Sequence, residues 1–188
     1  MAETKNRFPL VMKSTAAATA LLTVVLFTVH RFLPFQGILI AAITFFTTCY
    51  HFSMRLLVGF LVSKCIHPHN SGSFFFRQRS FEPKLYSLLG VKKWKLKMPT
   101  YDPSSFSLKH NTLEQVIWSS CVAEAVHRVI IVFSFLPLLF SLWWGDFPVF
   151  LCTSLASALY DGLFVIMQRY NRPRLERLLQ KKEVQHFQ

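Results

Sequence analysis

The chain has 188 residues and a formal net charge of +12, and 52% of its residues are hydrophobic. A chain of this length is too short for two ordinary domains, and this composition is too apolar for a typical soluble protein. Long apolar runs also exclude a nucleic-acid partner, which would need a soluble basic face. We therefore expect an all-α polytopic membrane protein with basic flanking segments.

Four apolar segments are long enough to cross a membrane. The first, at about 14–32, follows a basic start that resembles a signal peptide, but it has no cleavage site of small residues and another apolar run comes directly after it. The second, at about 35–62, is long enough to tilt or to continue as an interfacial helix beyond Tyr50. The third and fourth lie at about 117–142 and 147–167, joined by the tight, aromatic turn WWGDFP.

Lysine and arginine are concentrated in the middle segment, 64–111, and in the tail, 168–188. The turns on the opposite side contain only Arg31. By the positive-inside rule, this distribution predicts that the middle segment, the tail and both termini are cytoplasmic. We expect residues 1–188 to form a single integral domain of the cell membrane, with membrane lipids as partners.

The middle segment has an amphipathic pattern. A short helix is predicted from Pro83 to Leu89, with Gly90 as its stop. The following KKWKLKMP alternates lysines with apolar residues, among them Trp94 next to Lys95. This pattern suits a surface that lies on anionic headgroups, which stabilises membrane contact by about 1 kcal/mol per cation. The alternative is a solvated basic loop.

Ionisable residues interrupt three of the predicted spans, namely His51, Arg55, Glu124, His127, Arg128 and Asp161. Each costs about 2.5–3.5 kcal/mol in a membrane helix unless it faces a partner or water. The helical rise places all of them roughly 10–18 Å from the cytoplasmic boundary. The sequence therefore predicts one polar cavity that opens to the cytoplasm.

The spacing of these residues suggests a catalytic role. Glu124 and His127 are three positions apart and share a helix face, and Glu124 and Arg128, four positions apart, can pair. A carboxylate beside an imidazole orients it and raises its basicity, as general-base catalysis requires. The alternatives are a buried ion-pair network for Glu124 and Asp161, and a structural or metal-binding His127. Because CIHPHN, at residues 65–70, lacks a second half of a zinc site, we expect no metal there.

The segment QRYNRPR begins where the fourth span meets water. Its Arg169, Arg172 and Arg174 are candidates for binding a phosphate or a lipid headgroup, with simple anchoring as the alternative. No P-loop, dinucleotide fingerprint or nucleophile elbow is present in the sequence. The four cysteines are expected to be free, buried thiols.

Three sequence blocks resemble the glycosyl-diaponeurosporenoate acyltransferase family of bacterial carotenoid synthesis. They are FRQRSFEPKLYSLLGVKKWKLKMP, CVAEAVHR and QRYNRPRLERLL, and the likeness covers roughly residues 76–179. The family elements map to Lys93, Trp94, Lys95 and Pro99, to Cys121, Glu124 and His127, and to Gln168, Arg169, Tyr170, Asn171 and Arg172.

The resemblance implies transfer of a fatty acyl group from an acyl-CoA-like co-substrate to a sugar hydroxyl of a glycolipid or carotenoid, without a further cofactor. His127 would be the base and Glu124 its orienting group. Substrate contacts are expected from His51, Arg55, Trp94, Lys95, Arg128, Asp161, Gln168, Arg169, Asn171 and Arg172.

Two other functions fit the sequence. A non-catalytic small membrane subunit or lipid-binding accessory protein would use the charged residues to hold its helices together. A lipid enzyme with phosphate-transfer chemistry is less favoured, because it would need pairs of metal-binding carboxylates and only Asp161 and Glu124 lie in the spans.

Overall fold

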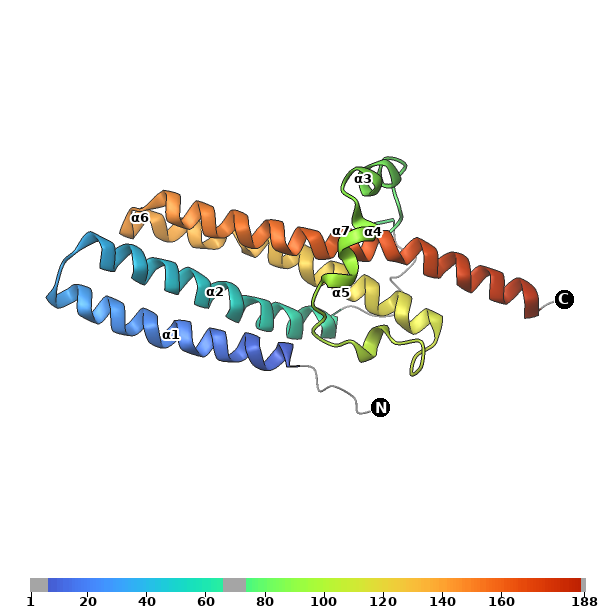
Figure 1. The fold of residues 1–188 in the computed structure, drawn as a ribbon, viewed down its shortest axis with the longest axis horizontal. Coiled ribbons are helices and arrows are strands. Elements are labelled where there is room, and N and C mark those ends of the chain that lie inside the picture. The colour runs from blue at the N-terminus through green and yellow to red at the C-terminus, as the bar shows by residue number, and fades with distance from the viewer. Residues whose placement is uncertain (1–6, 66–73, 187–188) are drawn as a thin grey trace. The chain divides into compact units, whose positions relative to one another are not determined.

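The computed structural model describes residues 7–65 and 74–186, and the regular elements in these ranges are all helices. The elements, with η for a 3-10 helix, are α1 (Phe8–Phe32), α2 (Gln36–Cys65), α3 (Glu82–Leu88), α4 (Val91–Trp94), η2 (Lys95–Lys97), η3 (Ser104–Phe106), α5 (Leu113–Phe133), η4 (Leu136–Phe140), α6 (Ser141–Trp144) and α7 (Phe147–His186) (Figure 1). Four helical stretches are long and apolar enough to cross a membrane. This confirms the predicted all-α fold with four such helices.

The first two helices are longer than their predicted spans. α1 begins at Phe8 rather than Ser14, with a proline in its first turn, where a missing N–H is tolerated. It ends at Phe32, before Leu33 and Pro34, and α2 then continues unbroken to Cys65. Threonines within these helices satisfy their hydroxyls locally: Thr19, Thr23 and Thr44 each donate to the carbonyl four residues earlier.

The third predicted span is interrupted. α5 ends at Phe133, and the chain continues through η4 and α6. Pro137 has no N–H to donate to the carbonyl of Phe133, so the helical hydrogen bond is lost at this point. The hydroxyl of Tyr50 on α2 donates to that carbonyl instead, at 2.9 Å.

The tight turn predicted between the third and fourth spans is present. Gly145 and Asp146 both have positive φ, of 69° and 46°. The side-chain amide of Gln36, at the start of α2, donates to the Asp146 carboxylate at 3.2 Å. The turn before α2 is thereby tied to the turn before α7.

The last helix extends beyond the predicted fourth span, which ends at about Met167. α7 continues through the expected tail to His186, although Pro173 lies inside it. The tail therefore presents its arginines at helical spacing, with Arg169 and Arg172 on one face.

The chain forms two compact units. Unit 1 comprises the described residues up to Phe60 together with Val129–Asp161. Unit 2 comprises the described residues of Leu61–Arg128 together with those from Gly162 onward. Helices α2, α5 and α7 each contribute to both units.

Unit 1 contains an aromatic cluster. The ring of Trp144 lies 5.2 Å from that of Phe46 and 5.3 Å from that of Phe27. Phe140 and Phe150 also pack on Trp144, and Phe150 is fully buried. These contacts hold α1, α2, α6 and α7 together next to the turn.

Unit 2 contains the middle segment. α3 ends before Gly90, whose φ of 58° is left-handed, which confirms the predicted helix stop. Val91 is fully buried, whereas Leu88 and Leu96 are 85% and 87% exposed. Lys92, Lys93 and Lys97 are exposed on the same segment, so its exposed surface combines apolar and basic side chains.

Candidate functional site

Glu124 is the centre of a buried ion-pair cluster in unit 2. Its side chain has no exposed surface. One carboxylate oxygen accepts a hydrogen bond from Arg169 at 2.8 Å and pairs with Arg128, and the other accepts from Arg172. The predicted pairing of Glu124 with Arg128, one turn along α5, is therefore present.

A second carboxylate, Glu82, completes the cluster. It is 4% exposed and lies at the start of α3. Arg169 donates to it through Nε at 3.0 Å and also through Nη2, and the Tyr86 hydroxyl donates to it at 2.6 Å. Arg169 thus joins Glu82 and Glu124 through one planar guanidinium, a geometry that lysine cannot reproduce.

Hydrogen bonds and burial together determine the protonation state of the Glu82 carboxyl. Burial by itself raises the pKa of this carboxyl, but the hydrogen bonds from Arg169 and Tyr86 outweigh burial and lower it. The pKa of Tyr86 is raised, because its hydroxyl is buried and its proton is held by Glu82. Glu82 is therefore an ionised partner of Arg169.

Arg172 anchors the middle segment to α7. Its guanidinium donates to the backbone carbonyls of Phe76 at 3.0 Å and Ser120 at 3.2 Å, and its side chain is 1% exposed. Arg169 similarly donates to the carbonyl of Arg77 at 2.8 Å. The carbonyls of Phe76 and Arg77 lie outside regular helices, so these two arginines satisfy them and position the start of the middle segment.

Arg128 is the most accessible cation of the cluster. Its side chain is 28% exposed, against 9% for Arg169 and 1% for Arg172. Its guanidinium lies over the ring of Phe75, 4.1 Å from the centroid. Three guanidinium groups face the two carboxylates Glu82 and Glu124, so the cluster has one excess positive charge. Such a charge in a water-poor site can stabilise a developing oxyanion or bind a phosphate.

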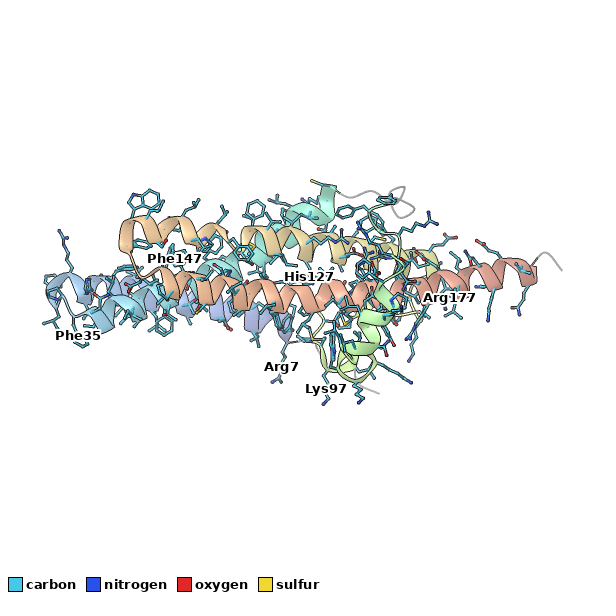
Figure 2. The ribbon with its side chains drawn as sticks, turned by 90° about the horizontal axis from the view of Figure 1, so that it is seen from above. Arg7, Phe35, Lys97, His127, Phe147 and Arg177 are labelled. Atoms are coloured by element: carbon cyan, nitrogen blue, oxygen red, sulfur yellow. The ribbon has the colours of Figure 1, made fainter. Side chains whose placement is uncertain are left out.

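His127 lies next to this cluster in the chain. Its ring stacks on that of Phe164 with centroids 4.4 Å apart and an angle of 8° between the planes, which places it between α5 and α7 (Figure 2). The proposed roles of His127 as the base and of Glu124 as its orienting group remain predictions. The observed geometry shows Glu124 holding three arginines, which is the buried ion-pair arrangement predicted as the alternative.

The structure also places the other predicted site residues of unit 2, and two of them, Lys95 and Asn171, are in contact. The Lys95 amine donates to Asn171 at 2.7 Å and lies 4.8 Å from the centroid of the Tyr170 ring. Burial, together with the positive charges of Arg174 and Lys92, lowers the pKa of Lys95. Trp94 donates its indole N–H to the carbonyl of Leu89 at 3.0 Å, and Gln168 is buried.

The remaining predicted residues belong to unit 1. Arg55 pairs with Asp161 at 2.5 Å, and Asp161 is fully buried, so the predicted pairing of Asp161 with a cation is present. His51 is 5% exposed on the same face of α2 as Arg55. The charged residues of the spans thus form one cluster in each unit, and the single shared cavity stays a prediction.

Sequence reasoning assigned no role to Glu82 or Tyr86. Two features of the sequence could have pointed to them. Both residues lie in the first sequence block that resembles the acyltransferase family, and their acid and hydroxyl groups are four residues apart on one helix face. Arg169, the partner of Glu82, lies 87 positions away from it, beyond any local spacing rule.

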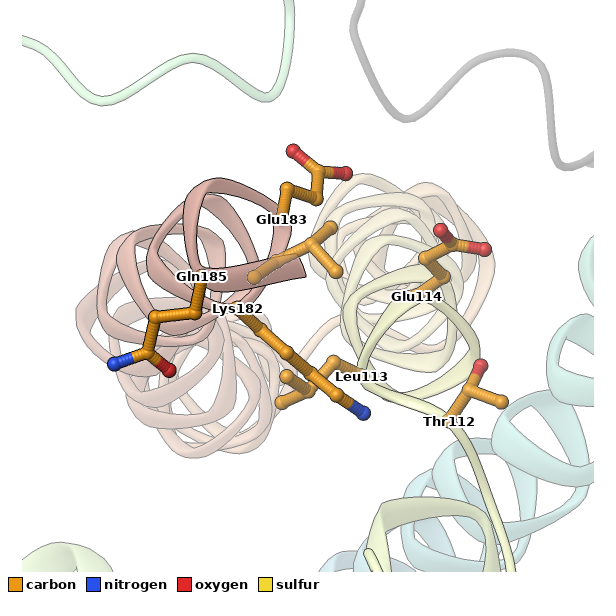
Figure 3. Close-up of a pocket in the computed structure, with 7 residues that line it drawn as sticks. Thr112, Leu113, Glu114, Lys182, Glu183 and Gln185 are labelled. Carbon is orange, nitrogen blue, oxygen red and sulfur yellow. The ribbon is translucent and has the colours of Figure 1, made fainter. Parts of the chain in front are cut away.

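An open depression elsewhere in unit 2 has a volume of about 490 Å³ and is formed by the start of α5 and the end of α7 (Figure 3). Charges of both signs line it, among them Glu114, Lys182 and Glu183. It shares no residue with the ion-pair cluster, and we assign it no role.

Within residues 7–65 and 74–186, no group of three or more histidine, cysteine, aspartate or glutamate side chains is placed to hold a metal ion. His67 and His69 of the CIHPHN segment lie outside the described residues. The four cysteines are free thiols, as predicted, but of these four only Cys121 is buried, whereas Cys65 and Cys152 are exposed, contrary to the prediction.

The fold and the cluster together define a small helical membrane protein that encloses guanidinium–carboxylate pairs. The model of the glycosyl-4,4'-diaponeurosporenoate acyltransferase family matches residues 72–181, more than half of the chain. The chain belongs to this family, which confirms the predicted resemblance. Comparisons with curated proteins and with solved structures find no match.

The family match covers all the residues of the unit 2 cluster and also Asp161. His51 and Arg55 lie before the matched region. The name of the family implies acyltransferase activity, and the four apolar helices indicate association with a membrane.

Proposed function

We propose that the protein is a membrane-bound O-acyltransferase that moves a fatty acyl group from an acyl-CoA-like donor to a hydroxyl of a glycosylated lipid or carotenoid. The observation that carries this proposal, beyond the family match, is the cluster around Glu124 with its one excess positive charge. Its most accessible cation, Arg128, directly follows His127 on α5.

The proposed reaction is transfer of an acyl group from a thioester to a hydroxyl. The His127 imidazole takes the proton of the acceptor hydroxyl while the oxygen attacks the carbonyl carbon of the thioester. The negative charge on the carbonyl oxygen is stabilised by Arg128, which Glu124 holds in place. The C–S bond then breaks, and the thiolate takes the proton from His127. The products are an ester and a free thiol, with no oxidation or reduction.

The exposed basic and apolar face of the middle segment supports binding of an amphipathic donor. Lys92, Lys93 and Lys97 attract anionic phosphates, and the neighbouring leucines suit the acyl chain or lipid tails. We propose that the segment lies on the cytoplasmic side of the cell membrane, where acyl-CoA is available.

The test supplies a labelled acyl-CoA and a glycolipid pool to membranes that contain the wild type, His127→Ala or His110→Ala. General-base catalysis contributes about 10²–10⁴-fold, so His127→Ala should lose at least about 100-fold of the transfer rate. His110 is exposed between η3 and α5, and its variant should retain activity. Equal transfer by all three proteins would remove His127 from the mechanism.

Comparison of lipid extracts with and without the gene tests the activity itself. We expect lipids whose mass is higher by one fatty acyl group only when the wild-type chain is present. Their absence, with the protein correctly inserted and a suitable glycolipid supplied, contradicts the acyltransferase function.

A non-catalytic accessory role is favoured by one specific observation, namely that Glu124 accepts from three arginines within the protein. If the cluster is purely structural, Arg128→Gln leaves two arginines facing two carboxylates, so this variant should retain both expression and the cellular phenotype. If Arg128 is catalytic, the same variant should retain expression but lose acyl transfer.

A further inference from the structure

Unit 1 contains a polar cluster that the reaction proposed above does not use. Arg55 on α2 donates to the Asp161 carboxylate at 2.5 Å and to the Ser157 hydroxyl at 2.8 Å, both on α7. Ser157 in turn shares a hydrogen bond of 2.9 Å with Ser134. Ser134 and Asp161 are fully buried and Ser157 is 7% exposed, so these polar groups lie inside an apolar unit.

His51 faces this cluster with both ring nitrogens unused. Its side chain is 5% exposed, and neither Nδ1 nor Nε2 has a hydrogen-bond partner among the described residues. Its backbone carbonyl accepts from Arg55 at 3.1 Å, and the charges of Arg55 and Asp161 both act on its ring. Nε of Arg55 is likewise buried without a partner.

Leaving a buried polar group without a partner costs about 1–3 kcal/mol. A residue needed only for packing would be apolar here, since α2 is otherwise rich in apolar side chains. The unused nitrogens of His51 therefore point to a molecule that binds there.

Charge and hydrogen bonding identify the class of that molecule. Arg55 and Asp161 neutralise each other, so the cluster has no excess charge to attract an anion, in contrast to the three arginines of unit 2. A neutral imidazole offers one donor and one acceptor, and a hydroxyl is the simplest uncharged group that can satisfy both. The surrounding helices are apolar, so the molecule that carries the hydroxyl must be lipid-like.

We propose that His51, supported by Arg55 and Asp161, binds the hydroxyl group of an uncharged, lipid-like molecule. The proposal rests on the proposed function in one respect, namely that the bound molecule is the acyl acceptor, held through a hydroxyl other than the one that reacts. Binding itself does not depend on catalysis.

The direct test uses the full chain in phosphatidylcholine nanodiscs, with histidine labelled by ¹⁵N and His51 assigned by the loss of its signals in His51→Gln. Solid-state NMR follows the ring nitrogens while 1-dodecanol or dodecane is added. We expect 1-dodecanol, but not dodecane, to shift both His51 resonances in a saturable manner. Identical responses to the two probes, or none, overturn the proposal.

A second arm distinguishes two sources of the hydroxyl. Phosphatidylglycerol carries headgroup hydroxyls that phosphatidylcholine lacks. If nanodiscs of phosphatidylglycerol already show the shifted resonances without 1-dodecanol, the site binds the headgroup hydroxyl of an anionic lipid, which overturns the proposed uncharged ligand. If the shift requires 1-dodecanol in both lipids, the site selects a separate lipid-like alcohol.

A kinetic arm separates this proposal from the acyltransferase function. With an active preparation, His51→Phe should raise KM for the acceptor at least tenfold and leave KM for acyl-CoA unchanged. His110→Phe serves as the matched control. An unchanged acceptor KM overturns the role in acceptor binding, whereas absence of transfer by the wild type contradicts the proposed function and leaves the NMR result intact.

Discussion

Glu124 shows how a single carboxylate can organise a buried site. It has no exposed surface, and its two oxygens accept from guanidinium groups on α5 and α7. A buried charge is tolerated only when it is paired and hydrogen-bonded, and removing one partner leaves the others unbalanced. The three arginines consequently depend on Glu124 for their positions.

We expect Glu124→Gln to lower the free energy of unfolding by about 3–5 kcal/mol, because it leaves buried guanidinium charge uncompensated. Glu114→Gln is the matched control, since Glu114 lies on the same helix but is exposed, and it should change stability by less than about 0.5 kcal/mol. Detergent unfolding followed by circular dichroism measures both. Similar small effects of the two variants would contradict the structural importance of the cluster.

The lowered pKa of Glu82 predicts that the stability of the protein depends on pH. Its pKa in the folded protein lies below the ordinary value of 4.5, because the Arg169 and Tyr86 hydrogen bonds outweigh the effect of burial. Its stabilising contribution is therefore fully present above pH 4.5 and is lost as pH falls through the lower, folded-state pKa. We expect the stability difference between wild type and Glu82→Gln to be large at pH 6 and to shrink toward pH 3. The same difference at both pH values would show that the Glu82 charge contributes nothing.

Among the elements, the third apolar segment shows how one proline determines a tertiary contact. Pro137 has no backbone N–H to donate to the carbonyl of Phe133. A carbonyl in an apolar membrane helix then needs another hydrogen-bond donor. Tyr50 supplies it from α2 at 2.9 Å. The interruption between α5 and η4 is thus linked to the packing of α2.

Tyr50→Phe should lower the free energy of unfolding by about 0.6 kcal/mol, the average for hydrogen bonds between membrane helices, and by no more than about 1.7 kcal/mol. In a Pro137→Ala background the restored N–H can bond the Phe133 carbonyl, so the same substitution should have little effect. A double-mutant cycle measures this coupling. Equal losses in the two backgrounds would show that Tyr50 and Pro137 act independently.

For the whole molecule, the distribution of charge is the feature that predicts orientation. Lysines and arginines are concentrated in residues 64–111 and 168–188, and the turns at 33–35 and 145–146 contain neither. Cationic loops are retained on the cytoplasmic side, so the middle segment and α7's end should face the cytoplasm. The four apolar helices are compatible with this topology but do not set its direction.

Single cysteines at Asp146, Ser104 and Gln180 in a cysteine-free background test this orientation. A membrane-impermeant maleimide should label the Asp146→Cys variant in intact cells, and the Ser104→Cys and Gln180→Cys variants only after permeabilisation. Labelling of all three in intact cells, with the cells shown to be sealed, would contradict the predicted topology.

Local features of the sequence were enough for the presence of four long apolar helical stretches, the Gly90 stop, the Gly145–Asp146 turn and the Glu124–Arg128 pair. Hydropathy, turn chemistry and helical spacing all act over a few residues. The partners of Arg169 and Arg172 required the fold, since Glu82 and Glu124 are far from them in the chain and a planar guanidinium must meet each carboxylate at hydrogen-bond distance. For the same reason the unused nitrogens of His51 could not be foreseen: whether a buried side chain has a partner depends on which distant groups folding brings beside it.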